Sequence, residues 1–142
     1  MIQSKLNHKR CYYERSKFCY LCGEYIQEKY RKPFETESTI YYFFTCYGFV
    51  PDLRHSFKGN GIHEQCRMNL SNAVNYNQRL KYSRPTIWKK PRFEHENCHI
   101  CKTDFYFQKA RKVKYPSRSS ALKPQPTGSN EGMCYYHLKQ MK

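Results

Sequence analysis

Four pairs of potential metal ligands repeat one spacing along this chain. Each pair holds two cysteines, or one cysteine and one histidine, separated by two residues: Cys19/Cys22, His63/Cys66, Cys98/Cys101 and Cys134/His137. Two such donors fit on one tight turn, with both ligand atoms directed at a single ion. Because structural zinc takes four nitrogen or sulfur ligands in a tetrahedron, the four pairs predict two closed zinc sites.

Sequential pairing is the simplest way to divide these ligands. It gives a first site made of Cys19, Cys22, His63 and Cys66, and a second site made of Cys98, Cys101, Cys134 and His137. A cross-brace arrangement would instead combine Cys19/Cys22 with Cys98/Cys101, and the spacing leaves both arrangements open. Sites closed by four protein ligands have no position for water, so we expect both metals to be structural.

Two cysteines fall outside the four pairs. Cys11 and Cys46 have no partner at this spacing, and we interpret them as small buried apolar side chains or uncoordinated thiols, although Cys46 could replace His63 as a ligand.

A redox-active disulfide is the alternative to metal binding for the two Cys-x-x-Cys pairs. A thioredoxin-type pair opens a helix after a strand, whereas the residues after Cys22 and Cys101 are typical of turns.

The composition indicates why this chain needs metal. Of its 142 residues 39% are hydrophobic, a low share for a compact domain, while 17% are aromatic, which is too many for a disordered chain. The chain should therefore fold around a thin core. Metal binding worth on the order of 10 kcal/mol per site would compensate for that core.

The periodicity of apolar residues predicts a first unit, residues 1–81. We expect a knuckle hairpin within residues 12–34 and a helix over residues 35–47, where apolar residues fall at helical offsets, capped by Thr36 or Ser38 and ended by Gly48. A second helix should run from Cys66 toward Leu80. A knuckle facing a ligand pair at a helix start is a treble-clef-like arrangement.

A second unit is predicted beyond a connector. Residues 82–91 are basic and contain two prolines, so we expect no helix there. Residues 92–142 should form a short β-hairpin through residues 105–115, an extended loop at residues 116–132 and a terminal helix or turn that closes the second site. The predicted fold class is thus a small, metal-stabilised α+β protein with two zinc modules.

Positive charge is concentrated in the middle of the chain. The whole sequence has 26 Lys and Arg against 11 Asp and Glu, and residues 79–123 hold 13 of the basic residues and 3 of the acidic ones. Such a field attracts polyanions. No apolar run is long enough to span a bilayer and the first residues lack a signal-type apolar stretch, so we expect an intracellular protein, nuclear or cytoplasmic, with no membrane partner.

Several segments together resemble an uncharacterised cysteine-rich, zinc-finger-like protein family that is multiplied in arthropod and other invertebrate genomes and has no established activity. The resemblance covers most of the chain and rests on residues 19–23, 41–46, 62–66, 85–91, 98–101, 115–117 and 121–126. Asn69 and Thr127 stand where the family tends to have a cysteine and a histidine. The resemblance therefore implies either that His63, Cys134 and His137 have taken over as ligands or that this copy has incomplete sites.

Binding of nucleic acid, DNA or RNA, is the function that these features favour. Basic side chains would neutralise phosphates and neighbouring rings would stack on bases. The candidate residues are Arg84, Trp88, Lys89, Lys90, Arg92, Lys109, Arg111, Lys112 and Lys114.

The alternative is a protein-interaction or dimerisation adaptor that uses the apolar cluster of residues 40–47. An enzyme, and with it a small-molecule substrate, is not expected. Asp52 and Asp104 are the only aspartates, no glycine-rich phosphate loop is present, and nothing places Cys46 beside His55 as a nucleophile and base.

Overall fold

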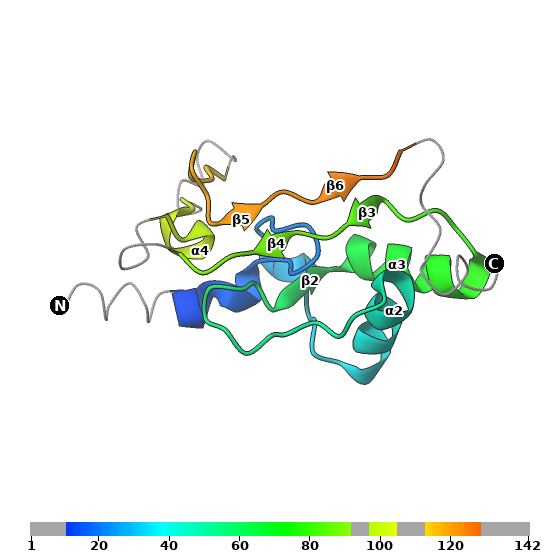
Figure 1. Cartoon of the computed structure of the whole chain (residues 1–142). Helices are drawn as coiled ribbons and strands as arrows, with labels where there is room; N and C mark the ends of the chain where they lie inside the picture. Colours follow the sequence, from blue (N-terminus) through cyan, green and yellow to red (C-terminus); the bar gives the residue numbers. More distant parts are fainter. Residues whose placement is uncertain (1–10, 92–96, 105–112, 129–142) are drawn as a thin grey trace.

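The chain folds as a small α+β protein, as the sequence predicted, in a computed structural model that describes residues 11–91, 97–104 and 113–128. Figure 1 shows helices α2 (Glu37–Tyr47) and α3 (Glu64–Tyr76) side by side at one end and the single turn α4 (His99–Lys102) at the other. Short strand pairs run between these ends. No helix among the described residues is long and apolar enough to cross a membrane.

The N-terminal part forms a knuckle that is closed by a distant strand. Residues 11–14 are helical and continue into the 3-10 turn η1 (Arg15–Lys17), and a second 3-10 turn, η2 (Glu28–Tyr30), leads into β1 (Arg31–Pro33). Strand β1 pairs antiparallel with β2 (Gly61–His63). A side chain at Gly61 would collide with the carbonyl oxygen of Ser16, so glycine is required for this close approach.

Helix α2 begins at a side-chain cap and ends at a glycine. The Thr36 side chain accepts a hydrogen bond from the Thr39 amide at 3.3 Å, and Gly48 ends the helix with a φ of 81°. The predicted helix over residues 35–47 is confirmed. Its apolar stripe is wider than the core face, because Phe43 is fully buried while Phe44 is 47% exposed.

Helix α3 starts directly after β2 and packs its buried face, Leu70 and Ala73, toward α2. It ends before the predicted limit at Leu80. Asn77 takes a left-handed conformation with a φ of 54°, which stops the helix. Leu80 is still buried, but it reaches the core from the segment after the helix.

The predicted connector, residues 82–91, pairs with the predicted loop at residues 116–132. Strand β3 (Tyr82–Arg84) pairs antiparallel with β6 (Gln125–Pro126), and β4 (Ile87–Trp88) pairs antiparallel with β5 (Ala121–Leu122). The expected open loop at residues 116–132 therefore contains two short strands in its described part. The predicted hairpin through residues 105–115 falls mostly outside the described residues, although Asp104 and Lys114 form an antiparallel bridge at its base.

Aromatic rings fill the core beneath the knuckle. The rings of Tyr20, Phe34 and Phe43 contact one another with centroid distances of 5.0 to 5.6 Å. The Trp88 indole N–H donates to the Tyr20 carbonyl at 2.9 Å. Strand β4 is therefore anchored on the first knuckle through a buried side chain, and the described parts of both halves share one core.

Candidate metal centres

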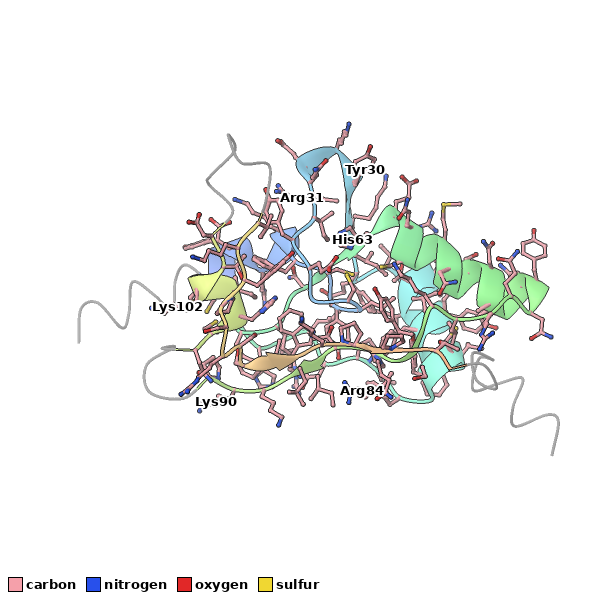
Figure 2. All side chains as sticks on the ribbon, turned by 90° about the horizontal axis from the view of Figure 1, so that it is seen from above. Tyr30, Arg31, His63, Arg84, Lys90 and Lys102 are labelled. Atoms are coloured by element: carbon pink, nitrogen blue, oxygen red, sulfur yellow. The ribbon has the colours of Figure 1, made fainter. Side chains whose placement is uncertain are left out.

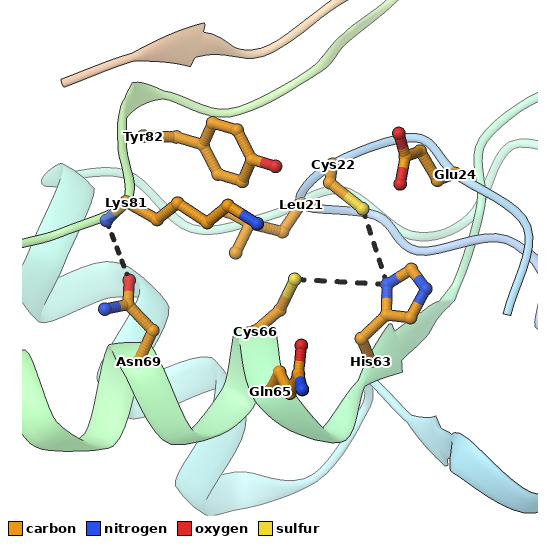
Figure 3. Close-up of a pocket in the computed structure, with 9 residues that line it drawn as sticks. All are labelled: Leu21, Cys22, Glu24, His63, Gln65, Cys66, Asn69, Lys81 and Tyr82. Atoms are coloured by element: carbon orange, nitrogen blue, oxygen red, sulfur yellow. Dashed lines mark hydrogen bonds between the residues drawn. The ribbon is translucent and has the colours of Figure 1, made fainter.

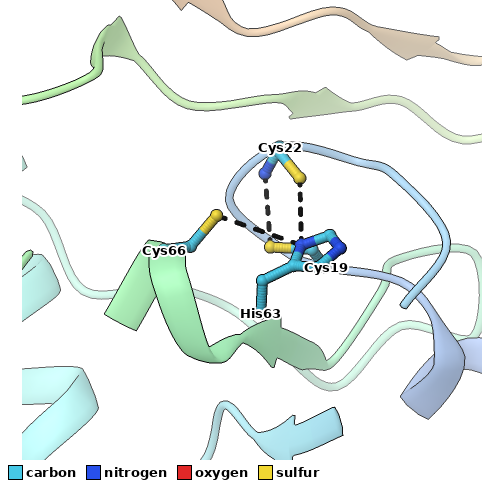
Figure 4. A group of neighbouring side chains, drawn as sticks. All are labelled: Cys19, Cys22, His63 and Cys66. Carbon is cyan, nitrogen blue, oxygen red and sulfur yellow. Dashed lines mark hydrogen bonds between the residues drawn. The ribbon is translucent and has the colours of Figure 1, made fainter. Parts of the chain in front are cut away.

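The first group of donors joins three separate parts of the fold. Cys19 and Cys22 lie on the turn after η1, His63 is the last residue of β2, and Cys66 lies in the first turn of α3. Their ligand atoms all lie within 4.8 Å of one another (Figure 4). The structure thus brings together the four residues that the spacing assigned to the first site.

The knuckle turn directs both sulfurs to one side. The Gly23 amide donates to the Cys19 carbonyl at 2.8 Å, and the Cys22 amide lies 3.5 Å from the Cys19 sulfur. Gly23 has a φ of 77°, a left-handed conformation in which a side chain is strained. A side chain would also crowd its neighbour, because a Cβ on Gly23 would lie 3.0 Å from the Thr86 hydroxyl oxygen.

His63 is oriented by the backbone opposite it. Its Nδ1 lies 3.4 Å from the sulfur of Cys22 and 3.9 Å from that of Cys66, while Nε2 lies 3.3 Å from the Tyr25 carbonyl oxygen. A proton on Nε2 would be donated to that carbonyl, and Nδ1 would then face the sulfurs with its lone pair. This is the carbonyl-supported orientation that histidine ligands of metals adopt.

The buried donors of the first group compete for protons, which shifts their pKa values in opposite directions. Burial opposes ionisation of Cys19, but hydrogen bonds from the thiols of Cys22 and Cys66 outweigh it and hold the pKa of Cys19 well below its usual range. The same contacts, with the proton kept on the donor sulfur, raise the pKa of Cys22. Burial lowers and the Cys19 thiolate raises the pKa of His63, and the net effect is an increase. A cation among the sulfurs would relieve this competition for protons.

A small cavity of about 150 Å³ borders this group, and the Lys81 side chain extends along it toward Cys22 and Cys66 (Figure 3). The Lys81 amide donates to the Asn69 side-chain oxygen at 3.0 Å, and the Asn69 amide group donates to the Arg79 carbonyl at 3.1 Å. The nearby Tyr82 phenol, followed by the Cys66 and Cys22 sulfurs, raises the pKa of Lys81. Lys81 would therefore offset the negative charge of three thiolates around a divalent ion, and Asn69 holds the segment that positions it.

The second group contains a cysteine that the spacing did not assign to any site. Cys11, from the N-terminal helical segment, places its sulfur within 4.8 Å of those of Cys98 and Cys101. Cys98 precedes α4 and Cys101 lies in it, and all three side chains are at least 96% buried. The seven described cysteines form no disulfide with one another. Cys134 and His137, the predicted partners of Cys98 and Cys101, lie outside the described residues.

The three sulfurs of the second group also compete for protons. A hydrogen bond from Cys101 lowers the pKa of Cys98, but the contact with Cys11 and burial together raise it to about 11. The hydrogen bond to Cys11 is the main reason that the pKa of Cys101 is raised. Three buried thiols that cannot all ionise alone form a donor set for a soft divalent metal, which would ionise them.

Sequence reasoning missed Cys11 because its partners are about 90 residues away. Only its membership in a set of eight cysteines pointed to a ligand role. Cys46, the other unassigned cysteine, belongs to neither group of the described residues. Its buried thiol lies 3.7 Å from the Leu70 carbonyl oxygen and packs between α2 and α3, which is the predicted role of a small buried side chain.

His99 links the two groups directly. Its Nε2–H donates to the Gly23 carbonyl of the first knuckle at 2.6 Å, and its Nδ1 lies 2.8 Å from the Ser119 hydroxyl. Burial outweighs the hydrogen bond to Gly23 and lowers the pKa of His99. The turn that carries Cys98 and Cys101 is thereby fixed against the turn that carries Cys19 and Cys22.

The residues predicted to contact nucleic acid fall into different environments. Trp88 is only 8% exposed and belongs to the core, so it offers no stacking surface. Lys89, Lys90 and Lys114 are exposed, while Arg84 is half-buried and donates to the Lys123 carbonyl. Figure 2 shows the side chains of Arg84 and Lys90 along the same edge of the molecule. Outside the described residues lie Arg92, Lys109, Arg111 and Lys112.

Comparison with known proteins adds no assignment. No family model, no curated protein and no solved structure matches this chain. The function is therefore inferred from the sequence and from the geometry of the described residues.

Proposed function

We propose that this chain is a zinc-stabilised basic protein that binds nucleic acid, mainly through phosphate contacts. The observation that carries the proposal is a surface of cations, over the described residues of 81–128, that no carboxylate neutralises. These residues include eight Lys and Arg and one acidic residue, Asp104. None of the eight basic side chains forms an ion pair with a carboxylate in the described part of the chain, and all of them except Arg84 are exposed. The eight residues are Lys81, Arg84, Lys89, Lys90, Lys102, Lys114, Arg118 and Lys123.

Zinc suits the donor sets better than other common metals. Thiolate and imidazole ligands favour zinc over magnesium or calcium, which prefer oxygen. The first group supplies three sulfurs and one nitrogen, the number that a closed tetrahedral site requires. Its knuckle and its ligand pair at the start of α3 support a treble-clef-like centre. Zinc held by Cys11, Cys98 and Cys101, with one further ligand, would complete the second centre.

A salt titration tests nucleic-acid binding. The zinc-loaded protein is mixed with fluorescent random pools of DNA and RNA, and anisotropy is measured at increasing potassium chloride. Phosphate contacts release counterions, so we expect affinity to fall steeply and linearly on a double-logarithmic plot. A protein that ignores both pools at low salt would overturn the proposed function.

The exposed apolar side chains near α2 favour a second candidate, a dimerisation or protein-binding adaptor. Tyr41, Phe44, Phe49 and Val50 are between 46% and 67% exposed, and they lie outside the basic region. Light scattering separates the two functions. A dimer that persists at high salt and binds neither nucleic acid pool would favour the adaptor.

A further inference from the structure

A groove of about 870 Å³ lies between the first knuckle and the described segment 113–124. The turn at residues 22–24 forms one wall, residues 113–124 form the other, and His99 and Thr86 line the space between them. Its volume falls in the range of sites that enclose most of a bound small molecule, roughly 300–1,000 Å³. It is therefore large enough for a few groups of an extended chain.

The two walls of the groove are tied together, so its shape exists before a ligand arrives. The Tyr25 amide donates to the Tyr115 hydroxyl at 2.8 Å, which fixes the second wall to the first knuckle. The Tyr115 ring stacks on His99 with a centroid distance of 5.3 Å and an interplanar angle of 3°. His99 in turn donates to the Gly23 carbonyl of the opposite wall. A preformed groove loses less entropy on binding than a mobile one.

The charge along the groove is mostly positive. Lys114, Arg118 and Lys123 are exposed cations of the second wall, and Glu24 is the single acidic residue that lines the groove within the described residues. Two tyrosine rings, Tyr82 and Tyr115, line the same space. A track of cations with aromatic rings beside it is the combination that binds single-stranded nucleic acid.

The local fold does not suit a double helix. A duplex is read by a helix or a two-stranded ribbon that enters its major groove, which is about 12 Å wide. Near the groove the described residues offer one helix, α4, of four residues that is buried at His99, Ile100 and Cys101. They also offer two strand pairs, β3–β6 and β4–β5, but each strand has only two or three residues, too short a ribbon to follow a major groove. An unpaired strand can instead follow the wall and place its bases between the rings.

We propose, on the basis of the nucleic-acid-binding function above, that this groove binds a single strand of DNA or RNA. Lys114, Arg118 and Lys123 contact successive phosphates. A base stacks on the face of Tyr115 that His99 does not cover. The groove depends on the first knuckle and on α4, because the hydrogen bond between His99 and Gly23 links its walls.

The experiment compares two triple variants of the full-length, zinc-loaded protein. Lys114→Gln/Arg118→Gln/Lys123→Gln removes the cations of the groove, and Lys29→Gln/Lys32→Gln/Arg79→Gln removes three exposed cations elsewhere, so the two variants have the same net charge. Fluorescein-labelled 12-nucleotide oligo-dT and oligo-U, and a duplex of equal length, are titrated by anisotropy. We expect the groove variant to bind oligo-dT or oligo-U at least about 10-fold more weakly than wild type, with a salt slope about 2 units shallower, since each phosphate contact on a single strand contributes about 0.7.

Three outcomes are decisive. Wild-type protein that binds no nucleic acid overturns the proposed function itself. Wild-type binding with equal losses in both variants leaves that function intact but overturns the groove, as does a preference for duplex. Photocrosslinking of 4-thio-substituted oligonucleotides, followed by peptide mapping, gives a readout that does not depend on the variants: crosslinks at residues 113–124 support the groove, and crosslinks confined to other segments overturn it.

Discussion

Single side chains determine which metal the first group could hold. His63 supplies the one nitrogen among three sulfurs, and its Nε2 faces the Tyr25 carbonyl while Nδ1 faces Cys22 and Cys66. The sequence predicted this donor set because each pair lies on one local turn or at one helix start, where spacing alone brings ligands together. The sequence did not predict that Cys11 joins the second donor group, because no rule of local spacing connects residue 11 with residues 98 and 101.

Replacement of Cys11 by serine tests the second centre. We expect Cys11→Ser to bind about one zinc ion per chain where the wild type binds about two, because a hydroxyl is a poor zinc ligand. Elemental analysis after purification in reducing buffer measures the ratio.

Cys46→Ser is the matched control, since Cys46 is also buried but lies in neither group. It should retain both ions. If Cys11→Ser also retained both, Cys11 would not be a ligand, and Cys134→Ser analysed in parallel would then show whether that residue completes the site.

Gly23→Ala tests the geometry of the first knuckle. A residue with a side chain pays about 1–2 kcal/mol in the left-handed conformation, and the new Cβ would in addition lie 3.0 Å from the Thr86 hydroxyl. We expect a lower melting temperature and weaker retention of one zinc ion against a chelator. Glu24→Ala, at the exposed neighbouring position, should behave as wild type; equal behaviour of both variants would contradict the strained turn.

At the scale of elements, helices α2 and α3 were predictable, although α3 ends earlier than predicted, whereas the short turn α4 and the strand pairs were not. Residues 40, 43, 44 and 47 share one helical face, so their periodicity identified α2. Strands β3 to β6 contain two or three residues each, too few to produce an alternating pattern. Their paired residues lie 33 to 44 residues apart in the sequence, so pairing is decided by the tertiary fold and by the anchor of Trp88 on Tyr20.

Helix α3 connects Cys66, a candidate metal ligand, to the core, which gives a prediction at this scale. Leu70 is fully buried one turn after Cys66. We expect Leu70→Ala to lower the free energy of unfolding by about 2–5 kcal/mol, as truncation of a buried leucine does. Met68→Ala changes a side chain on the same helix that is 49% exposed and should cost much less. Denaturant unfolding of the zinc-loaded proteins measures both, and equal losses would contradict the assigned packing.

For the whole molecule, metal bound by the two donor groups would tie together segments that are far apart in the sequence. The first group joins β2 and α3 to the knuckle, and the second joins the N-terminal segment to α4. The basic surface and the groove are built on the same framework, because β3 to β6 and His99 rest on the first knuckle.

Removal of metal should therefore affect the whole molecule. In reducing buffer with a strong chelator, we expect the cooperative thermal transition followed by circular dichroism to be lost, because the binding energy of a structural zinc is part of the folding energy. The same chelator saturated with zinc beforehand is the control and should leave the transition in place. If the protein in chelator melted with an unchanged transition, its aromatic core would be sufficient to fold the chain without metal.

The order of the donors along the chain has a consequence for a protein that acquires zinc while it is being made. The donors of the first group are complete at residue 66, whereas Cys11, although it leaves the ribosome first, meets its last described partner only at residue 101. At 5–20 residues per second, those 35 further residues take about 2–7 s. The nascent chain would thus bind its first zinc ion while Cys11 is still without its partners Cys98 and Cys101.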